Sequence, residues 1–433
     1  MIPAARISAA IEVLSDIDVR RRPAPDALKD WGLSHRFAGS SDRAAIAGLV
    51  YDALRRKASS AFVMGEAGPR ANMLGMLRLE RGLDTDAISR LFDGSRFAPP
   101  PLNEAEQERL GAASLDDAPP HVAGDYPEWL DSSFAAVFGE ARTEEGAALS
   151  ARATLDLRVN LLNSDREAVA AELAEYNPEV TGWSPWGLRI RTAPGAKSPA
   201  IQSEPAFIKG HVEIQDEGSQ LAALLSGAAP GEQVVDLCAG AGGKTLALAA
   251  MMQNKGQIYA TDSDKRRLAP IHARLERATA RDVQVRTPRG AMEILDDLKG
   301  TIDLVLIDAP CTGTGSWRRN PDAKWRLRPG ALDQRRKDQA VALDRAVPLV
   351  RPGGRIAYVT CSVLDEENGA QIGDFLGRHG EFSVEKPEQV TAALGERGYL
   401  FRKAALLTET GVLMTPRRTG TDGFFVSILR RNG

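Results

Sequence analysis

The second half of the chain alternates short apolar segments with helical stretches, and this alternation constrains the fold more than any other feature. After Gly210, the segments with the length and apolar content of buried strands are EQVVDL, QIYATD, DVQVRT, DLVLID and RIAYVT. The stretches between them with helical character include KTLALAAMMQ, DKRRLAPIHARLERAT and DQAVALDRAVPLV. Such alternation predicts a parallel sheet with helices on both faces, a doubly wound α/β fold. The last stretch, GVLMTPRRTGTDGFFVSILRR, predicts two antiparallel strands at the edge of that sheet.

Two regions of different character precede this fold. The first is rich in Ala, Leu, Ile and Arg at helical spacing, as in SSDRAAIAGLVYDALRRKASSAF, and predicts an all-α domain. The second predicts a small α+β unit from the strand LDLRVNLL, the helix DREAVAAELAEY and the strand GLRIRT. A chain of 433 residues has room for two or three domains. We therefore expect a helical domain over 1–145, an α+β connector over 146–210 and a doubly wound, Rossmann-like domain over 211–433.

The composition argues against several classes of protein. The chain is 43% hydrophobic and 26% charged, and it has no apolar run that approaches the roughly 18 residues of a membrane span. Its three cysteines (Cys238, Cys311 and Cys361) form no Cys-x-x-Cys pair, and its five histidines show no ligand spacing. We therefore expect a monomeric cytoplasmic protein without a membrane span, a disulfide framework or a bound metal.

Positive charge is concentrated locally, although the net charge is only −3. Residues 317–351 contain ten Lys/Arg against four Asp/Glu. An excess of this kind can bind a phosphate backbone, but a solvated helix face has the same composition. Charge alone leaves both interpretations open.

The loop after the first strand of the alternation, VVDLCAGAGGKT, is rich in glycine and opens a helix. Gly240, Gly242 and Gly243 allow a tight turn and a close approach of the backbone to a ligand. Asp262 ends the next strand, nineteen residues beyond Gly243, where an acid suits the hydroxyl groups of a ribose. An adenosyl cofactor fits best. A P-loop fits Gly243-Lys244-Thr245 but has Cys238 in place of its first glycine, and a merely structural turn also stays open.

Two cysteines and one acid follow two other strands. Asp308 is the last residue of DLVLID, Cys311 lies three residues further on, and Cys361 comes directly after RIAYVT. In a doubly wound sheet these side chains meet at the edge that holds the glycine loop. Either cysteine could instead be a small buried hydrophobe.

The same three residues are the minimum set for methylating carbon 5 of a cytosine. That carbon becomes nucleophilic enough only after a thiolate adds to carbon 6. A carboxyl group beside N3 and the amine disperses the charge, and a second group must remove the carbon 5 proton. Asp308, Cys311 and Cys361 supply this set, but the residues themselves leave open which thiol is the nucleophile.

Several longer motifs occur in a fixed order along nearly the whole chain. They are FAGSSDRAAIAGLVYDALRR, FIKGHVEIQDEGSQ, DLCAGAGGKT, DAPCTGTGSWRRNPDAKWR, YVTCSVLDEENG and GTDGFF. On these motifs the chain resembles the Sun-like family of RNA cytosine-5 methyltransferases, and within it the bacterial members that act on 16S ribosomal RNA and carry an N-terminal domain similar to NusB. The pairing of DAPC with TCS is highly specific for this family.

The resemblance implies transfer of a methyl group from S-adenosylmethionine to carbon 5 of a cytosine in RNA, with 16S ribosomal RNA as the substrate. It makes Cys361 the nucleophile, gives Cys311 a role in product release, and places Lys244 near the flipped base. The cofactor contacts that it implies are Cys238, Ala239, Gly240, Ala241, Gly242, Gly243, Lys244, Asp262 and Asp308. A non-catalytic RNA-binding or ribosome assembly factor, and a methyltransferase for a different RNA, are the alternatives.

Two positions depart from the family pattern. Ala241 stands where the family loop often has proline, and Arg289 and Gly290 stand where an acid usually lies near the adenine. We therefore assign no contact to the adenine.

The segment RRNPDAKWRLRPGALDQRRK, which follows the Asp308–Cys311 turn, is the best candidate for substrate contact. Its arginines would rim the active site, and Trp317 and Trp325 could stack on a base or a ribose. The alternative is that both tryptophans fill the core beneath a loop.

Overall fold

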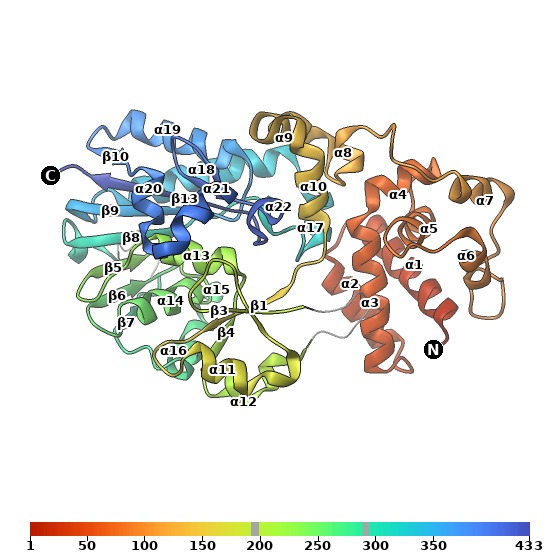
Figure 1. Ribbon diagram of the computed structural model, residues 1–433, viewed down its shortest axis with the longest axis horizontal. Coiled ribbons are helices and arrows are strands. Elements are labelled where there is room, and N and C mark those ends of the chain that lie inside the picture. The colour runs from red at the N-terminus through yellow and green to blue at the C-terminus, as the bar shows by residue number, and fades with distance from the viewer. Residues whose placement is uncertain (192–198, 289–293) are drawn as a thin grey trace. The chain divides into compact units, whose positions relative to one another are not determined.

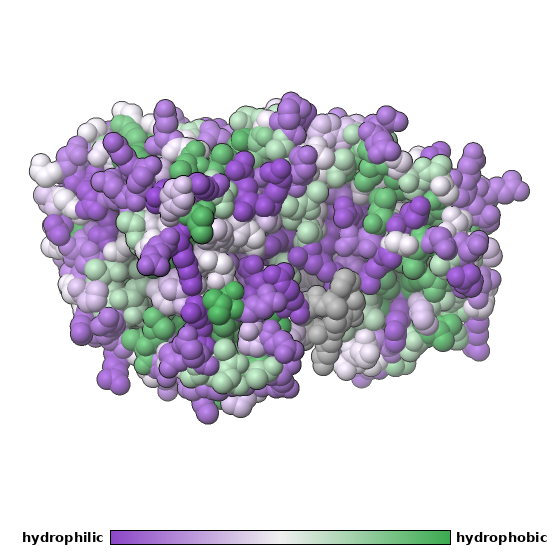
Figure 2. Space-filling view, in the orientation of Figure 1, coloured by the Kyte–Doolittle hydropathy of each residue, from purple (hydrophilic) through white to green (hydrophobic). Residues whose placement is uncertain are grey.

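The computed structural model describes residues 1–191, 199–288 and 294–433 (Figure 1). Two compact units are present. The helical unit comprises Met1–Arg152 and Trp317–Leu327, and the sheet unit comprises Ala153–Thr192, Pro199–Ser316 and Arg328–Gly433. Hydrophilic side chains cover most of the face that Figure 2 shows. Among the helices in the described ranges, none has the combination of length and apolar character that a membrane crossing needs.

The helical unit has its apolar core between α1, α3 and α5, whose Leu14, Val50 and Leu74 are buried together. The helices of this unit are α1 Pro3–Arg20, α2 Ala24–Ser34, α3 Ser40–Arg55, α4 Lys57–Met64, α5 Pro69–Leu79, α6 Thr85–Leu91, α7 Glu104–Gly111, α8 Pro120–Ala123, α9 Asp131–Phe138, α10 Arg142–Ser150 and α17 Pro321–Arg326. The prediction of helices throughout the N-terminal region is therefore confirmed. Its likeness to NusB stays a prediction.

The sheet unit is built on a large mixed sheet. Its strands are β5 Gln233–Asp236, β6 Gln257–Ala260, β7 Val283–Val285, β8 Ile302–Asp308, β9 Val350–Thr360, β10 Phe382–Val384, β11 Leu406–Leu407, β12 Val412–Met414 and β13 Phe424–Arg431. They lie in the order β11-β12-β13-β9-β8-β5-β6-β7, and β10 pairs with β13. The pairs among β5 to β9 are parallel, which confirms the five strands predicted from the alternation.

The C-terminal strands are antiparallel as predicted, but their predicted place at the sheet edge is wrong for β13. This strand lies between β9 and β12. Its residues from Phe424 to Leu429 are all buried, because β13 pairs with a strand along each edge and both faces of the sheet are covered there.

Helices cover both faces of this sheet. They are α13 Glu217–Leu225, α14 Gly243–Met251, α15 Lys265–Leu268, α16 Ile271–Arg277, α18 Pro329–Ala346, α19 Gly369–Arg378, α20 Pro387–Val390, α21 Gly398–Ala404 and α22 Pro416–Thr419. Leu304 and Leu306 of β8 pack in one cluster with residues of α13 and α14. Side chains alternate along a strand, so the intervening residues face the other side, where Tyr358 of β9 donates a hydrogen bond to the carbonyl of Glu367 between α18 and α19.

One helix differs from the prediction. The stretch 264–279 forms two short helices, α15 and α16, rather than one. Pro270 stands between them, and its ring and missing N–H interrupt the helical hydrogen bonds.

A second, four-stranded antiparallel sheet belongs to the same unit. Its order is β2-β3-β1-β4, with β1 Leu155–Val159, β2 Glu179–Val180, β3 Gly187–Ile190 and β4 Val212–Ile214. Leu157 and Leu188 from its strands pack against Val169 of α11 (Arg166–Glu172) and Ala206 of α12 (Pro205–Ile208). The strand–helix–strand pattern predicted here is confirmed, and the domain boundaries at 145 and 210 stay predictions.

Candidate active site

The predicted site residues follow four neighbouring parallel strands, and the strand register brings the strand ends level. Asp236 at the end of β5 pairs with Ala260 of β6 and Leu306 of β8, and Asp308 pairs with Val359 of β9. The residues that follow these strands therefore lie along one edge of the sheet, as the sequence predicted. This is the edge where doubly wound sheets bind their ligands.

The glycine loop connects β5 to α14. Gly242 has a φ of 86°, and a Cβ added there would lie 2.5 Å from Cγ1 of Ile271, so only glycine fits. Gly240 also has a positive φ, of 50°. The two glycines turn the chain so that α14 begins at Gly243 with its first N–H groups at the open edge.

The carboxylate of Asp262, which the loop covers, is almost completely buried. It accepts hydrogen bonds from the N–H groups of Gly240 and Asp264, each at 2.9 Å. A Cβ added at Gly240 would lie 3.9 Å from Oδ2 of Asp262, so the glycine keeps the space beside the carboxylate open. A ribose diol can donate hydrogen bonds there, and the residues therefore fit an adenosyl cofactor.

Two arginines that the sequence reasoning missed brace this loop. Arg158 of β1 is fully buried and donates to the carbonyl of Gly243 at 2.7 Å, and burial lowers the pKa of its guanidinium to about 10. Arg274 of α16 donates to the carbonyl of Ala241 at 2.8 Å and forms an ion pair with Glu213 at 2.8 Å. Both arginines lie far from the loop in the sequence and belong to no recognisable motif.

Burial shifts the pKa values of two ionisable groups directly beneath the loop. The carboxyl of Asp236 is completely buried, which raises its pKa to about 7, and it accepts a hydrogen bond from Thr245 Oγ1 at 2.7 Å. Burial also raises the pKa of the Cys238 thiol. Cys238 therefore stays a neutral thiol, and only its backbone is suited to a polar ligand.

Lys244 and Asp308 form an ion pair across the edge of the sheet. Nζ of Lys244 lies 2.8 Å from Oδ2 of Asp308 and 5.1 Å from the ring centroid of Phe424. The lysine side chain is only 7% exposed, whereas that of Asp308 is 36% exposed. The pair therefore presents a charged, hydrogen-bonding carboxylate to a ligand while the lysine is held behind it.

Cys311 and Cys361 lie together, with their Sγ atoms 3.3 Å apart. The hydrogen bond between the two thiols, together with burial, raises the pKa of Cys311 well above its usual range. Cys311 therefore keeps its proton at neutral pH and can donate a hydrogen bond to the sulfur of Cys361. Backbone hydrogen bonding fixes the position of Cys361, whose carbonyl accepts from the N–H of Gly315 at 2.9 Å.

A buried carboxylate holds the turn that carries Cys311. Glu367 accepts hydrogen bonds from the N–H of Thr312 at 2.8 Å, from its hydroxyl at 2.5 Å and from Nε2 of Gln339 at 3.0 Å. Gln339 also donates to the carbonyl of Pro310 at 3.0 Å. Burial raises the pKa of Glu367. Glu367 and Gln339 were not predicted as site residues; the motif YVTCSVLDEENG contains Glu367, but its three neighbouring acids do not indicate which one is buried.

The prediction that Trp317 and Trp325 stack on RNA is wrong. Trp317 is 1% exposed and stacks on Phe134, with ring centroids 6.0 Å apart. Nε1 of Trp325 donates to the carbonyl of Leu54 at 2.6 Å. Both rings fill the helical unit, because the segment Trp317–Leu327 belongs to that unit.

The basic residues of the same segment are also partly enclosed. Lys324 is completely buried, donates to Ser150 Oγ at 2.8 Å, and has its pKa lowered to about 7 by burial. Arg318 is 6% exposed, and Arg326 forms an ion pair with Asp322 at 3.0 Å. The segment is therefore mainly a structural insertion into the helical unit.

Two predictions lie at the limits of what the structure describes. Arg289 and Gly290, the departure near the expected adenine site, lie outside the described residues. Within the described residues, no group of three or more His, Cys, Asp or Glu side chains is arranged to hold a metal ion.

The sequence of the chain is similar to those of known proteins. Residues 223–430 match the family described as 16S rRNA methyltransferase RsmB/F. The aligned region covers 98% of this chain and 98% of the probable ribosomal RNA small subunit methyltransferase B of Synechocystis, and the two sequences are 30% identical over it. A second alignment covers 70% of this chain and 66% of the ribosomal RNA small subunit methyltransferase B of Erwinia tasmaniensis, with 33% identity.

Solved structures have the same fold. The superposition on a crystal structure of the protein PH0851 covers 100% of this chain and 99% of that chain, with a TM-score of 0.71 and 25% sequence identity. NSun6 from Pyrococcus horikoshii, solved with SFG, covers 71% of this chain and 98% of its own, with a TM-score of 0.60 and 20% identity. The second match supports the fold alone.

Proposed function

The chain belongs to the RsmB/F family of 16S rRNA methyltransferases, and from this membership we propose that it methylates carbon 5 of a cytosine in 16S ribosomal RNA through a covalent bond to Cys361. At the coarser level, it is an S-adenosylmethionine-dependent RNA methyltransferase. The choice of cytosine, the covalent bond and the 16S target form the proposal.

One observation carries the proposal, namely the 3.3 Å separation between the sulfurs of Cys311 and Cys361. Methylation at carbon 5 needs one group that adds to carbon 6 and a second that removes the carbon 5 proton. Two thiols side by side at the ligand-binding edge supply both. An RNA-binding or assembly factor without catalysis would have no use for this pair.

Cys361 is the nucleophile in this mechanism. Cys311 holds its own proton and donates a hydrogen bond to the neighbouring sulfur, which stabilises a thiolate on Cys361. The thiolate forms a bond to carbon 6 of the cytosine, and the electron pair of the ring double bond moves toward carbon 5 and N3. The carboxylate of Asp308, which is 36% exposed, accepts a hydrogen bond from the exocyclic amine, and the positive charge of Lys244 behind it offsets the negative charge that develops at N3.

S-adenosylmethionine supplies, when bound, the electrophilic methyl group that carbon 5 takes up. Among the residues of this chain, Asp262 would hold the ribose, and the loop from Cys238 to Lys244 would hold the rest of the cofactor through its backbone. Asp308 borders both the loop and the base. The buried Arg158 and the partly exposed Arg274 keep the loop in the conformation that leaves the ribose site open.

Cys311 assists release of the product. Once Cys361 is bonded to carbon 6, the hydrogen bond between the two sulfurs that raised the pKa of Cys311 is gone. Cys311 then loses its proton to solvent, and its thiolate takes the proton from carbon 5. The ring double bond forms again, the bond between carbon 6 and sulfur breaks, and the electron pair returns to Cys361. The two sulfurs again share one proton as at the start, so one proton is released per methyl group transferred.

The proposed partner is RNA, and the proposed setting is the cytoplasm, where the chain would act as a monomer. A cytosine within structured RNA must leave its stack to reach the thiols, which costs a few kcal/mol. Within Trp317–Leu327, which belongs to the helical unit, Trp317 and Lys324 are buried, so an RNA contact from this segment is left to its exposed positions Asn320 and Arg326.

The test is methyl transfer from labelled S-adenosylmethionine to 16S RNA, presented naked and as free 30S subunits, followed by nucleoside analysis. The proposal predicts 5-methylcytidine in at least one of the two forms. A methylated nucleoside of another kind would contradict the proposed chemistry. Transfer to transfer RNA but to neither form of 16S RNA would leave the chemistry in place and replace the target.

A further inference from the structure

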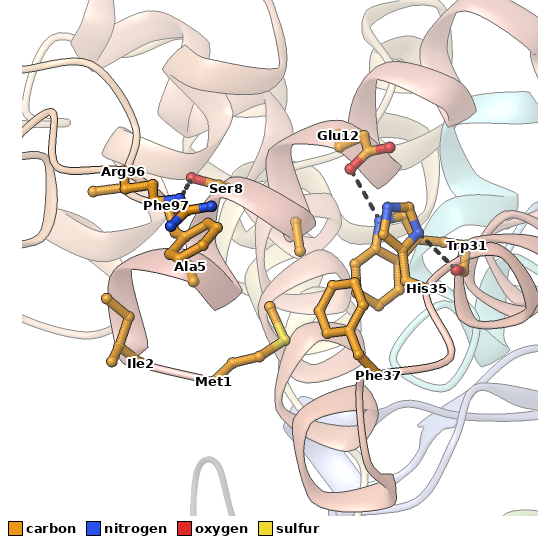
Figure 3. A pocket seen from close by; sticks show the side chains of 12 residues that line it. Met1, Ile2, Ala5, Ser8, Glu12, Trp31, His35, Phe37, Arg96 and Phe97 are labelled. Carbon is orange, nitrogen blue, oxygen red and sulfur yellow. Dashed lines mark hydrogen bonds between the residues drawn. The ribbon is translucent and has the colours of Figure 1, made fainter.

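The helical unit has an open pocket of about 630 Å³ that no step of the proposed mechanism uses (Figure 3). It lies beside α1, between the loop around Phe97 on one side and the end of α2 with Phe37 on the other. A volume of this size is within the range of small-ligand sites. The pocket therefore has room for one nucleoside.

Aromatic side chains form the walls of the pocket. His35 stacks on Trp31 with ring centroids 4.3 Å apart and an interplanar angle of 10°. Phe37 is 73% exposed and Phe97 is 58% exposed, although large aromatic side chains are usually covered. Ser8 Oγ donates to the carbonyl of Phe97 at 2.9 Å and so fixes this wall to α1. Flat, solvent-exposed walls of this kind stack on nucleobases.

One carboxylate in the pocket can favour some bases over others. Oε2 of Glu12 accepts a hydrogen bond from Nε1 of Trp31 at 3.0 Å, as Figure 3 shows. Its other oxygen receives no donor from the residues that the structure describes, and it can accept from an amino group. Adenine, cytosine and guanine present such a group on the Watson–Crick edge, whereas uracil has no amino group and its only donor there, N3–H, lies between two carbonyls that a carboxylate repels.

One arginine in the lining of the pocket can neutralise a phosphate. The guanidinium of Arg96 lies 5.0 Å from the ring centroid of Phe97. Within the described ranges Arg96 forms no ion pair. The combination of exposed rings, one unpaired cation and one acceptor fits a nucleotide better than an aliphatic peptide side chain.

From these observations we propose that the pocket binds an unpaired base of the RNA substrate that carries an amino group (adenine, cytosine or guanine), with the base between Phe37 and Phe97, its amino group on Glu12 and a phosphate beside Arg96. The identity of the ligand rests on the proposed RNA substrate, but the pocket lies apart from the methylation chemistry.

A neighbouring hollow supports a strand as the ligand rather than a single small molecule. It has a volume of about 510 Å³ and shares Ser8, Glu12 and Ala98 with the pocket. It continues along α1 past Arg70 and the proline run Pro99–Pro101. Two adjoining hollows on one helix can hold consecutive nucleotides of a single strand.

The test measures binding of fluorescein-labelled hexaribonucleotides of adenylate, cytidylate and uridylate to the full chain by fluorescence anisotropy, without cofactor. The variants are Phe37→Ala and Phe97→Ala. The matched control is Phe62→Ala in α4, because Phe62 is also exposed (40%) but lines neither hollow. All three positions are exposed, so the variants should fold, which their thermal unfolding checks.

The proposal predicts that each pocket variant weakens adenylate and cytidylate binding at least about fivefold, whereas Phe62→Ala stays within about twofold of the unchanged chain. Uridylate should bind about tenfold more weakly than adenylate, and Glu12→Gln should reduce that difference because its amide can donate to a uracil carbonyl. Pocket variants that bind all three hexamers as Phe62→Ala does would overturn the proposal.

The outcome is separable from that of the methylation assay. Absence of 5-methylcytidine would contradict the proposed function but would leave the binding comparison intact, since that comparison needs no catalysis. Pocket variants with unchanged affinity for naked RNA and reduced affinity for 30S subunits would instead assign the pocket to a protein side chain, which also overturns the proposal.

Discussion

Removal of the Glu367 carboxylate should misplace Cys311 without altering either thiol. In Glu367→Ala, the N–H of Thr312 and the amide of Gln339 lose their buried acceptor. A buried donor without a partner costs about 1–3 kcal/mol, so these two cost at least about 2 kcal/mol. If that cost falls on the position of the turn, the release step that depends on Cys311 slows at least about 30-fold.

Glu367→Gln should restore most of the activity. The amide oxygen can accept from the N–H of Thr312 and from Gln339, and the amide N–H₂ can donate to the Thr312 hydroxyl, which also accepts. We expect single-turnover methylation within about threefold of the unchanged enzyme, because only the charge assistance to these bonds is lost.

The assay follows single-turnover methyl transfer and the amount of RNA-linked protein on a denaturing gel. Glu367→Ala should accumulate the linked form, and the exposed control Glu381→Ala should not. If Glu367→Gln were as slow as Glu367→Ala, the carboxylate would act through its charge or proton, and the positioning argument would be refuted.

Three further predictions concern the glycine loop and the buried charges. Gly242→Ala should weaken S-adenosylmethionine binding about tenfold, as measured by calorimetry. The control Gly300→Ala has a similar φ of 70° but no atom near its added Cβ, and it should leave the affinity unchanged. Equal affinities of the two variants would contradict the proposed role of the loop. Burial raises the pKa of Asp236 from 3.8 to about 7, so the folded state binds this proton more tightly and the free energy of unfolding should fall as pH rises from about 4 to 7. In urea titrations, Asp236→Asn should flatten that fall. An unchanged slope in the variant would contradict the assignment of the pH dependence to Asp236. Lys324 has the opposite sign, since a pKa lowered from 10.5 to about 7 makes the free energy of unfolding fall as pH drops through that range. Lys324→Met should remove this dependence, and a retained dependence would show that another group causes it.

The sequence predicted the sheet better than the helices around it. All five strands of the alternation are present, because a short apolar run between turn residues has few other places in a fold. The placement of β13 was missed, since apolar content on both faces indicates burial but does not name the neighbouring strands. The helix break at Pro270 was visible in the sequence, and here proline outweighed the helical spacing.

At the site, residues with a chemical signature were predicted and their supports were not. Asp308, Cys311 and Cys361 follow strands, so the topology alone brings them together. Glu367 and Arg158 act through contacts between distant segments, which no local pattern encodes. The tryptophans of 317–327 show the same limit, because a Trp/Arg/Lys-rich segment has one composition whether it binds RNA or fills a core.

The most direct test of the account is to identify the residue that bonds to RNA. Cys311→Ala should retain addition and methyl transfer but lose release, so a covalent complex should accumulate with S-adenosylmethionine and 16S RNA. Mass spectrometry after nuclease and protease digestion should find a 5-methylcytidine nucleotide on the peptide that contains Cys361. A linkage to Cys238, or full turnover with no linkage in Cys311→Ala, would contradict the assignment of the nucleophile and of the releasing thiol.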